Sequence, residues 1–129
     1  MGDLLQRGTD WLAQQRHEHL TRPVTYRRGD ASVEVQATIG RTVFRVDDTY
    51  GNVIRHVSRD YLIRAADLVV NDEATVPQRG DRIEEVIGDQ LVTHEVMSPD
   101  KATGDWRYSD PQRLTLRIHT KQIREEPLP

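Results

Sequence analysis

The residues best suited to acid–base chemistry or metal binding are the five histidines, His17, His19, His56, His94 and His119. Catalytic and metal sites both need several such groups to converge. His17 and His19 lie two residues apart in an expected helix, so they do not share a face, and His119 falls on the expected outward side of its strand. Neither a zinc-binding His-Glu-x-x-His sequence, a Gly-x-Ser-x-Gly sequence nor a phosphate-binding glycine loop occurs. We therefore expect solvated surface histidines, no catalytic or metal-binding residue, and no cofactor.

The carboxylates and the two Arg-Gly-Asp tripeptides are better explained as turns than as binding sites. Asp47, Asp48 and the acidic residues within 100–110 lack the alternating ligands and the glycine at the sixth position that a calcium loop needs. Arg-Gly-Asp occurs at residues 28–30 and 79–81, where expected strands end or begin. Glycine and aspartate are ordinary turn residues, so an adhesion function is not indicated.

Five arginines cluster in the middle of the sequence: Arg41, Arg45, Arg55, Arg59 and Arg64. Phe44, Tyr50 and Tyr61 lie among them, and basic charge beside aromatic rings is typical of surfaces that bind single-stranded nucleic acids. The formal net charge of −3 and the aromatic content of 5% argue against that function. The alternatives are a solvated arginine-rich face, or arginines that pair with acidic residues of a neighbouring subunit.

The composition is that of one small domain. The chain has 129 residues, of which 36% are hydrophobic and 30% are charged, so a small core should lie beneath a highly charged surface. The absence of cysteine excludes disulfides, thiolate metal sites and a cysteine nucleophile. No apolar run is long enough for a signal peptide or a membrane-spanning helix. We expect a soluble protein with no membrane partner, made in a cytoplasm and kept or assembled there.

Residues 1–22 are predicted to form a helical arm, with the helix itself over residues 3–20. Its apolar residues recur at spacings of three and four, which is the pattern of an amphipathic helix. Pro23 ends it, because proline disfavours the helical conformation of the preceding residue. The helix either packs on its own domain or presents a partner-facing surface. The candidate partner-facing residues are Leu4, Leu5, Trp11 and Leu12.

Most of the remaining chain alternates between apolar and polar residues, as half-buried strands do. Expected strands cover residues 24–28, 32–39, 59–64, 81–86, 90–97 and 114–120, with turns at Gly29-Asp30 and Gly88-Asp89. Gly40 should end or bend the second strand. The predicted fold class is mainly β: a small antiparallel β-barrel or sandwich of about six or seven strands, with an N-terminal α-helix.

The barrel domain should span residues 23–121, with a flexible tail over residues 122–129. Seven residues are expected on the core-facing side of their strands: Val33, Val35, Ala37, Ile39, Leu114, Leu116 and Ile118. Thr115, Arg117 and His119 should face outward, because successive side chains of a strand point to opposite faces.

Residues 41–57 form an excursion between two expected strands. They contain the turn-forming stretch 47–52 and end with a second extended segment, so they are either a second hairpin or a long loop. The apolar residues of the excursion favour a hairpin packed on the barrel over a loop in water. These residues are Val43, Phe44, Val46, Val53 and Ile54.

The segments, taken in order, form a recognisable set. They are an N-terminal helix with Trp11-Leu12, then residues 24–29, 33–40, 58–63, 77–83 and 94–96, and the closing stretch 117–121. This order resembles the small head–tail joining proteins of tailed phages and prophages, also called head–tail connector, stopper or adaptor proteins. The resemblance covers nearly the whole chain, although each segment alone has low specificity.

The resemblance implies a structural virion protein rather than an enzyme. Such a protein forms a homo-oligomeric ring at the portal vertex, in the neck of the virion. Its partners would be the portal or adaptor protein on the head side, the tail-terminator or tail-tube protein on the tail side, and the packaged DNA. The excursion would face the channel and help to retain the DNA. The candidate channel-facing residues are Arg45, Asp47, Asp48, Tyr50 and Asn52. The alternative is a small-barrel nucleic-acid-binding or interaction module.

Overall fold

The computed structural model describes residues 21–100 and 102–129, and almost every element in them is a strand. The predicted N-terminal helix, with Leu4, Leu5, Trp11 and Leu12, lies outside the described residues. Nine strands and one short 3₁₀ helix, η1, follow in chain order. They are β1 Arg22–Arg28, β2 Ala31–Asp47, β3 Val53–Arg64, η1 Ala65–Asp67, β4 Val69–Val70, β5 Glu73–Ala74, β6 Arg82–Ile87, β7 Gln90–Val96, β8 Trp106–Tyr108 and β9 Thr115–Pro127.

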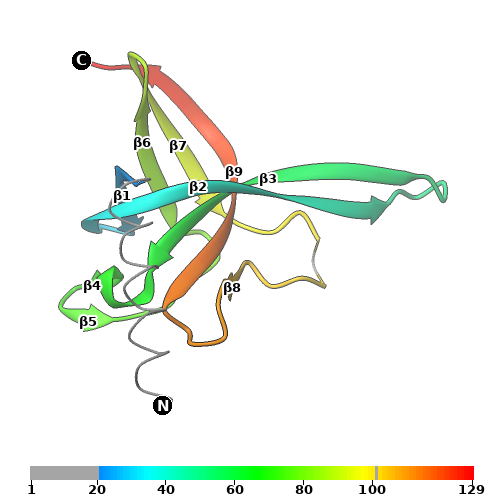
Figure 1. The fold of residues 1–129 in the computed structure, drawn as a ribbon. Helices are drawn as coiled ribbons and strands as arrows, with labels where there is room; N and C mark the ends of the chain where they lie inside the picture. Colours follow the sequence, from blue (N-terminus) through cyan, green and yellow to red (C-terminus); the bar gives the residue numbers. More distant parts are fainter. Residues whose placement is uncertain (1–20, 101) are drawn as a thin grey trace.

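Seven of the strands form one antiparallel sheet in the order β3-β2-β1-β6-β7-β9-β8, and β4 and β5 form a separate two-stranded sheet (Figure 1). The large sheet curls, so that β3 pairs with β9 as well as with β2. The hydrogen-bonded pairings therefore run in a circuit through β3, β2, β1, β6, β7 and β9. The prediction of a mainly β chain is confirmed.

The tight turns have the backbone conformations that their residues favour. Gly29 joins β1 to β2 with φ of 59°, and Gly88 joins β6 to β7 with φ of 62°. Positive φ of this size is accessible to glycine at little cost. Asn71 and Asp72 join β4 to β5 with φ of 54° and 65°, and asparagine and aspartate are the non-glycine residues that tolerate this region best. Both turns predicted from the sequence, Gly29-Asp30 and Gly88-Asp89, are therefore confirmed.

The hydrophobic core lies inside the curled sheet. Of the seven predicted core residues, Val35, Ala37, Leu116 and Ile118 are buried, and Val33 and Ile39 pack against the core while partly buried. The core also includes residues that the sequence pattern left unassigned, such as Tyr26, Tyr61 and Ile83.

Leu114 is the one predicted core residue that is wrong, since 38% of its surface is exposed. It precedes the first residue of β9 and belongs to the loop before that strand. There the Asp110 carboxylate accepts hydrogen bonds from the backbone N–H of Leu114, at 3.0 and 3.1 Å, and from that of Thr115, at 2.9 Å. Leu114 thus continues the alternating pattern of Leu116 and Ile118, but the strand begins one residue after it.

Two strands are longer than the sequence predicted. Gly40 was expected to end or bend the second strand, but β2 continues through it to Asp47. A Cβ at this position would lie 3.2 Å from Leu62 Cδ1, so glycine leaves room for the neighbouring side chains. The closing strand was expected to stop at residue 120. Instead β9 reaches Pro127, because residues 120–127 pair with β7, so most of the predicted tail at 122–129 belongs to the sheet.

The contrast between Leu116 and Leu114 gives the first prediction. Leu116→Ala should lower the free energy of unfolding by roughly 2–5 kcal/mol, the usual range for a buried leucine, because Leu116 is fully buried. Leu114→Ala is the matched control and should cost under about 1 kcal/mol, since the side chain is already exposed. Urea unfolding measures both values. Equal losses in the two variants would contradict the assigned core.

Candidate functional site

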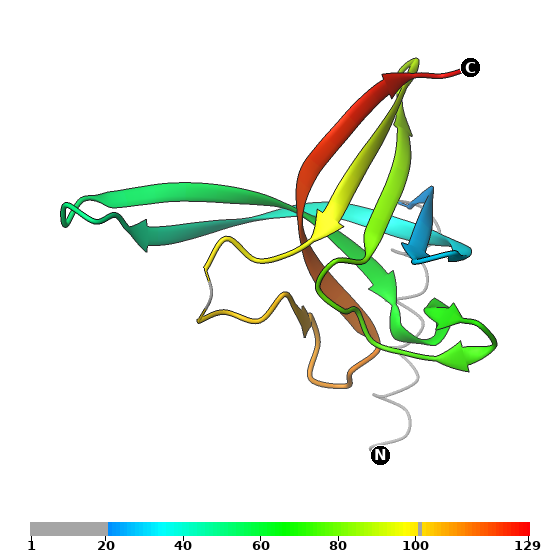
Figure 2. The ribbon, with the colours of Figure 1, turned by 180° about the vertical axis from the view of Figure 1, so that it is seen from behind.

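The most distinctive feature of the molecule is a long β-hairpin that projects from the curled sheet. Its strands β2 and β3 pair continuously from Ala37 opposite Ile63 to Asp47 opposite Val53. The pairing of β1 with β2 stops at Ala37, and that of β9 with β3 stops at Arg59. We call residues 41–58 the arm. Figures 1 and 2 show that it extends away from the body as a two-stranded ribbon.

The turn at the tip of the arm is built around Asp48. Its Oδ1 accepts hydrogen bonds from the backbone N–H of Asn52, at 2.7 Å, and of Tyr50, at 2.9 Å. Its own backbone N–H donates to the Asn52 carbonyl at 2.8 Å. Hydrogen bonds from the Asn52 and Tyr50 N–H groups hold the pKa of Asp48 below its usual range. Gly51 supplies the positive φ of 81° that closes the turn.

The five predicted channel-facing residues are thus placed at the far end of the arm. Asp47, Asp48, Tyr50 and Asn52 lie at the tip, and Tyr50 is 88% exposed. Arg45 lies two residues before the tip, directly opposite Arg55 on β3. The structure brings these residues to one place, and what they contact in an assembly remains a proposal.

The excursion was expected to pack its apolar residues on the body, and this is wrong for most of them. Val43, Val53 and Ile54 are exposed, as is Val57, whereas Phe44 is buried. Only the base of the ribbon is close enough to the body to be covered. Beyond this base, β2 and β3 pair only with each other among the described residues. Both outer edges of the ribbon are therefore open.

A buried carboxylate stands at the point where the arm leaves the body. Asp60, on β3, is completely buried. Its Oδ2 lies 2.8 Å from Arg117 Nη1, and its Oδ1 lies 2.9 Å from His119 Nδ1. The hydroxyls of Thr42 and Ser58 also donate to this carboxylate. Asp60 therefore links β2, β3 and β9 at one point, and we call these five residues the anchor.

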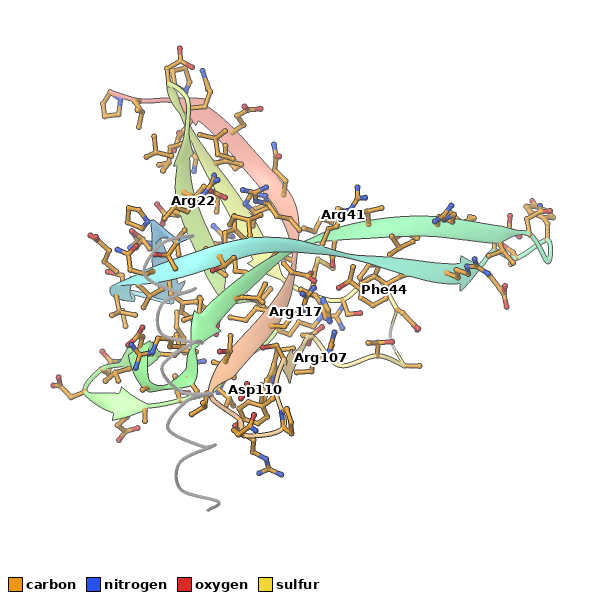
Figure 3. The ribbon with its side chains drawn as sticks, viewed as in Figure 1. Arg22, Arg41, Phe44, Arg107, Asp110 and Arg117 are labelled. Carbon is orange, nitrogen blue, oxygen red and sulfur yellow. The ribbon has the colours of Figure 1, made fainter. Side chains whose placement is uncertain are left out.

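The anchor keeps Asp60 ionised. Burial alone would raise its pKa, but hydrogen bonds from His119, Ser58 and Thr42 outweigh burial and lower the pKa to about 2. Arg117 extends the link to the arm, because its Nη1 also lies 3.4 Å from the Arg41 carbonyl oxygen. Figure 3 shows Arg117 below the ribbon, near the base of the arm.

His119 was predicted to be a solvated residue on the outward side of its strand, and only its direction was right. It does point away from the core, yet it is buried because Phe44 of the arm packs edge-on against it, with ring centroids 5.1 Å apart. His94 is buried as well. The base of the arm covers the outer face of β9. This contact joins segments far apart in the sequence, so the alternating pattern of β9 could not have revealed it.

A second polar network lies inside the body. Glu85 is fully buried as a side chain and bonds Arg59 Nη2 and the Tyr61 hydroxyl, both at 2.6 Å. His94 Nδ1 lies 2.9 Å from the same hydroxyl. Burial, and then the charge of Arg59, lower the pKa of His94 to about 4. Arg59 follows directly after the arm, so this network also fixes β3 where the arm begins.

The carboxylates of both networks are bonded by groups of the chain itself, although Arg117 Nε is buried without a hydrogen-bond partner among the described residues. Within residues 21–100 and 102–129, histidines and carboxylates do not gather in any group of three or more that could hold a metal ion. The polar groups of the anchor bond one another rather than converging on a cavity. The arrangement is therefore suited to holding strands together. No helix with the length and apolar composition of a membrane span occurs in the described ranges.

Comparison with known proteins agrees with this structural reading. The family model described as "Phage head-tail joining protein" matches residues 2–127. The chain belongs to this family. As a phage head–tail joining protein it is a component of the virion, with a structural role between head and tail. No curated protein matches the sequence.

The anchor gives the second prediction. Asp60→Asn should lower the free energy of unfolding at neutral pH by on the order of 3 kcal/mol, because Arg117 then loses its charged partner in a partly buried site. The pKa of Asp60 is lowered by folding, so its stabilisation is present above the unfolded pKa of about 3.9 and is lost as the pH falls towards about 2.

Urea unfolding at neutral pH and at about pH 3 tests this linkage. The gap between wild type and Asp60→Asn should narrow at the lower pH, since the wild type is then losing a contribution that the variant lacks. Asp47→Asn, an exposed carboxylate on the same hairpin, is the control and should shift stability by under about 0.5 kcal/mol. A gap of equal size at both pH values would show that the charge of Asp60 is not what stabilises the anchor.

Proposed function

We propose that this head–tail joining protein forms a homo-oligomeric ring at the portal vertex, where it joins the DNA-filled head to the tail and helps to retain the packaged DNA. In this proposal the circuit of six paired strands is a small barrel that serves as the body of each subunit. The portal or adaptor protein would lie on the head side and the tail-terminator or tail-tube protein on the tail side. Assembly would take place in the host cytoplasm.

The observation that carries the proposal is the arm. A two-stranded ribbon with open edges is marginally stable in water, and exposed edges invite pairing with other chains. The arm nevertheless has a hydrogen-bonded turn at its tip and a buried ionic anchor at its base. A chain that stabilises a projecting hairpin at both ends is adapted to present that hairpin to another molecule.

The tip carries both acidic and basic side chains, which suits a gate across the channel better than a tight DNA-binding site. Asp47 and Asp48 would repel phosphates, while Arg45 would attract them. Tyr50 presents an exposed ring that can pack against a neighbouring tip or a base. In the proposed ring, the tips converge towards the channel and block the exit of DNA without binding it strongly, because strong binding would slow ejection.

One observation favours a second function, a nucleic-acid-binding module. Arg41, Arg45 and Arg55 are exposed on the arm, and their guanidinium groups have no acidic partner among the described residues. Binding that depends on phosphates would weaken steeply as salt rises. Nucleic-acid binding by a monomer that takes no part in joining would favour this alternative.

The third prediction tests the tip. Replacing residues 47–52 with a short glycine–serine turn should leave the body folded, because the anchor lies at the other end of the arm. In a phage that depends on the variant, particles should lose packaged DNA or fail to join tails. Titre, electron microscopy and the DNA content of heads measure the outcome. Normal titre with full, tailed heads would contradict the proposed role of the tip.

Asp89→Ser is the matched control. It changes the exposed turn between β6 and β7 to a glycine–serine pair while keeping Gly88, which has the positive φ. Particles that carry this control should join and retain DNA as the wild type does. Equal defects in both variants would point to a general effect of turn substitution on the protein rather than to the tip.

A further inference from the structure

An apolar groove lies at the end of the body away from the β6–β7 turn. It has a volume of about 450 Å³ and is open to solvent within the part of the chain that the structure describes. Figure 1 shows the β4–β5 hairpin and β8, which supply part of its wall, at this end. Since Leu116 belongs to the hydrophobic core, the groove reaches from the surface to the core. The residues that line it are Ala65, Ala74, Thr75, Val76, Tyr108 and Leu116.

The polar groups of Thr75 and Val76 in this groove are already bonded within the chain. The Thr75 N–H donates to the Leu68 carbonyl at 3.1 Å. Arg28 donates to the Thr75 hydroxyl at 2.9 Å and to the Val76 carbonyl at 2.8 Å, and is itself paired with the Asp81 carboxylate at 2.8 Å. An occupant therefore gains mainly by apolar contact, so leucine or tryptophan side chains suit the groove better than the phosphates of DNA.

Apolar side chains are exposed beside the groove. Val69 lies opposite Ala74 in the β4–β5 register, so the two side chains share a face. Val69 is 38% exposed and Val76 is 40% exposed. Tyr108 is held in place by Trp106, with ring centroids 5.1 Å apart. Because the wall is positioned before any occupant binds, little ordering entropy is lost on docking.

The chain carries a segment of matching chemistry directly before β1. Residues 3–20, which lie outside the described residues, are predicted from the sequence to form an amphipathic helix. We call Leu4, Leu5, Trp11 and Leu12 the apolar stripe. Leu4 and Trp11 are seven positions apart, as are Leu5 and Leu12, and this spacing is typical of a helix that docks in a groove. A helix of this length is marginal alone in water, so it needs a surface to lie against.

The groove is within reach of this segment. Arg28, at the end of β1, bonds Thr75 and Val76, so the groove lies beside that end of the strand. Arg22, at the start of β1, is about 20 Å away along the strand. As a helix, residues 3–20 span about 26 Å. The segment that enters β1 at Arg22 is therefore long enough to fold back along β1 as far as the groove.

We propose that the apolar stripe of residues 3–20 docks in the apolar groove of the same chain and covers Val69 beside it. A tethered segment has a high effective concentration at its own body, which favours it over the same segment of a second copy. The contact lies within one chain, so it does not depend on the proposed ring. The stripe then faces the body rather than a partner, and the polar side of the segment is the surface that a neighbouring protein meets.

Tryptophan fluorescence tests the docking on the full-length protein. Trp106→Phe leaves Trp11 as the only tryptophan and keeps an aromatic ring beside Tyr108. The emission of Trp11 should then be shifted to the blue and shielded from acrylamide at every protein concentration, because docking is intramolecular. Adding Ala74→Arg, which puts a charged side chain in the groove, should shift the emission to the red and remove the shielding.

Ala102→Arg is the matched control, since Ala102 is also exposed and lies outside the groove. It should leave the emission of Trp11 unchanged, and circular dichroism checks that each variant keeps its β-sheet. Emission that is red-shifted and open to acrylamide before the groove is altered would overturn the docking proposal. A signal that Ala74→Arg does not change would overturn it as well.

The absence of cysteine allows a second measurement that leaves Ala74 in place. Val76→Cys is combined with one cysteine in the apolar stripe, at position 4, 5, 11 or 12. Mild oxidation should close a disulfide within one chain for at least one of these pairs, seen as faster migration in a gel without reducing agent. The control pairs place the second cysteine at Gln6, Asp10 or His17, on the opposite side of the predicted helix, and should not cross-link.

The cross-links also separate the possible occupants of the groove. No disulfide from any stripe position would overturn the proposal. Disulfide-linked dimers without the product within one chain would overturn it in favour of a second copy in the groove, as would shielding of Trp11 that grows with protein concentration. Equal cross-linking from the stripe and from the control positions would show that the segment has no fixed docked face.

Discussion

The structure depends on one buried carboxylate. Asp60 lies where the long hairpin leaves the curled sheet, and its two oxygens bond groups on β2, β3 and β9. A carboxylate in such a place is costly unless it is fully paired. Here burial disfavours its charge and the surrounding donors restore it, with the pKa lowered to about 2. The arm can project because its base is fixed by charge and not only by apolar packing.

The use of charge at the base of the arm, and of apolar packing in the core, follows from the composition. A chain with 36% hydrophobic residues has enough apolar surface for one small core, and that core fills the inside of the curled sheet. Little remains to bury a second hairpin of the length of the arm. Instead, polar networks around Asp60 and Glu85 fix the place where the arm joins the body. The valines of the arm stay exposed. In a protein that works within a larger assembly, a neighbouring protein can cover such exposed valines.

Much of the fold could be predicted from local pattern. Alternation and turn residues located β1, the hairpin of β6 and β7, and the inward faces of β2 and β9, because each depends on neighbours in the sequence. Leu114 was misassigned for a local reason, since it lies one residue before its strand in a loop that Asp110 holds. The other failures depend on contacts between distant segments. β2 continues through Gly40, where the missing side chain leaves room for Leu62, and residues 122–127 join the sheet because they pair with β7. His119 is covered by Phe44, 75 positions earlier in the chain. The candidate site was found only in part: the sequence placed the tip, but the anchor required the pairing of β3 with β9 to be known.

The most direct test of the account is the protonation of Asp60 in the folded protein. The side-chain carboxyl signal of Asp60 can be followed by NMR as the pH is lowered from neutral to about 3, together with amide signals at the base of the arm. The account predicts that Asp60 stays largely ionised at that pH, consistent with a pKa of about 2, and that the amides of the arm keep their native positions. A carboxyl that titrates near the ordinary value of about 3.9 while the arm stays in place would contradict it.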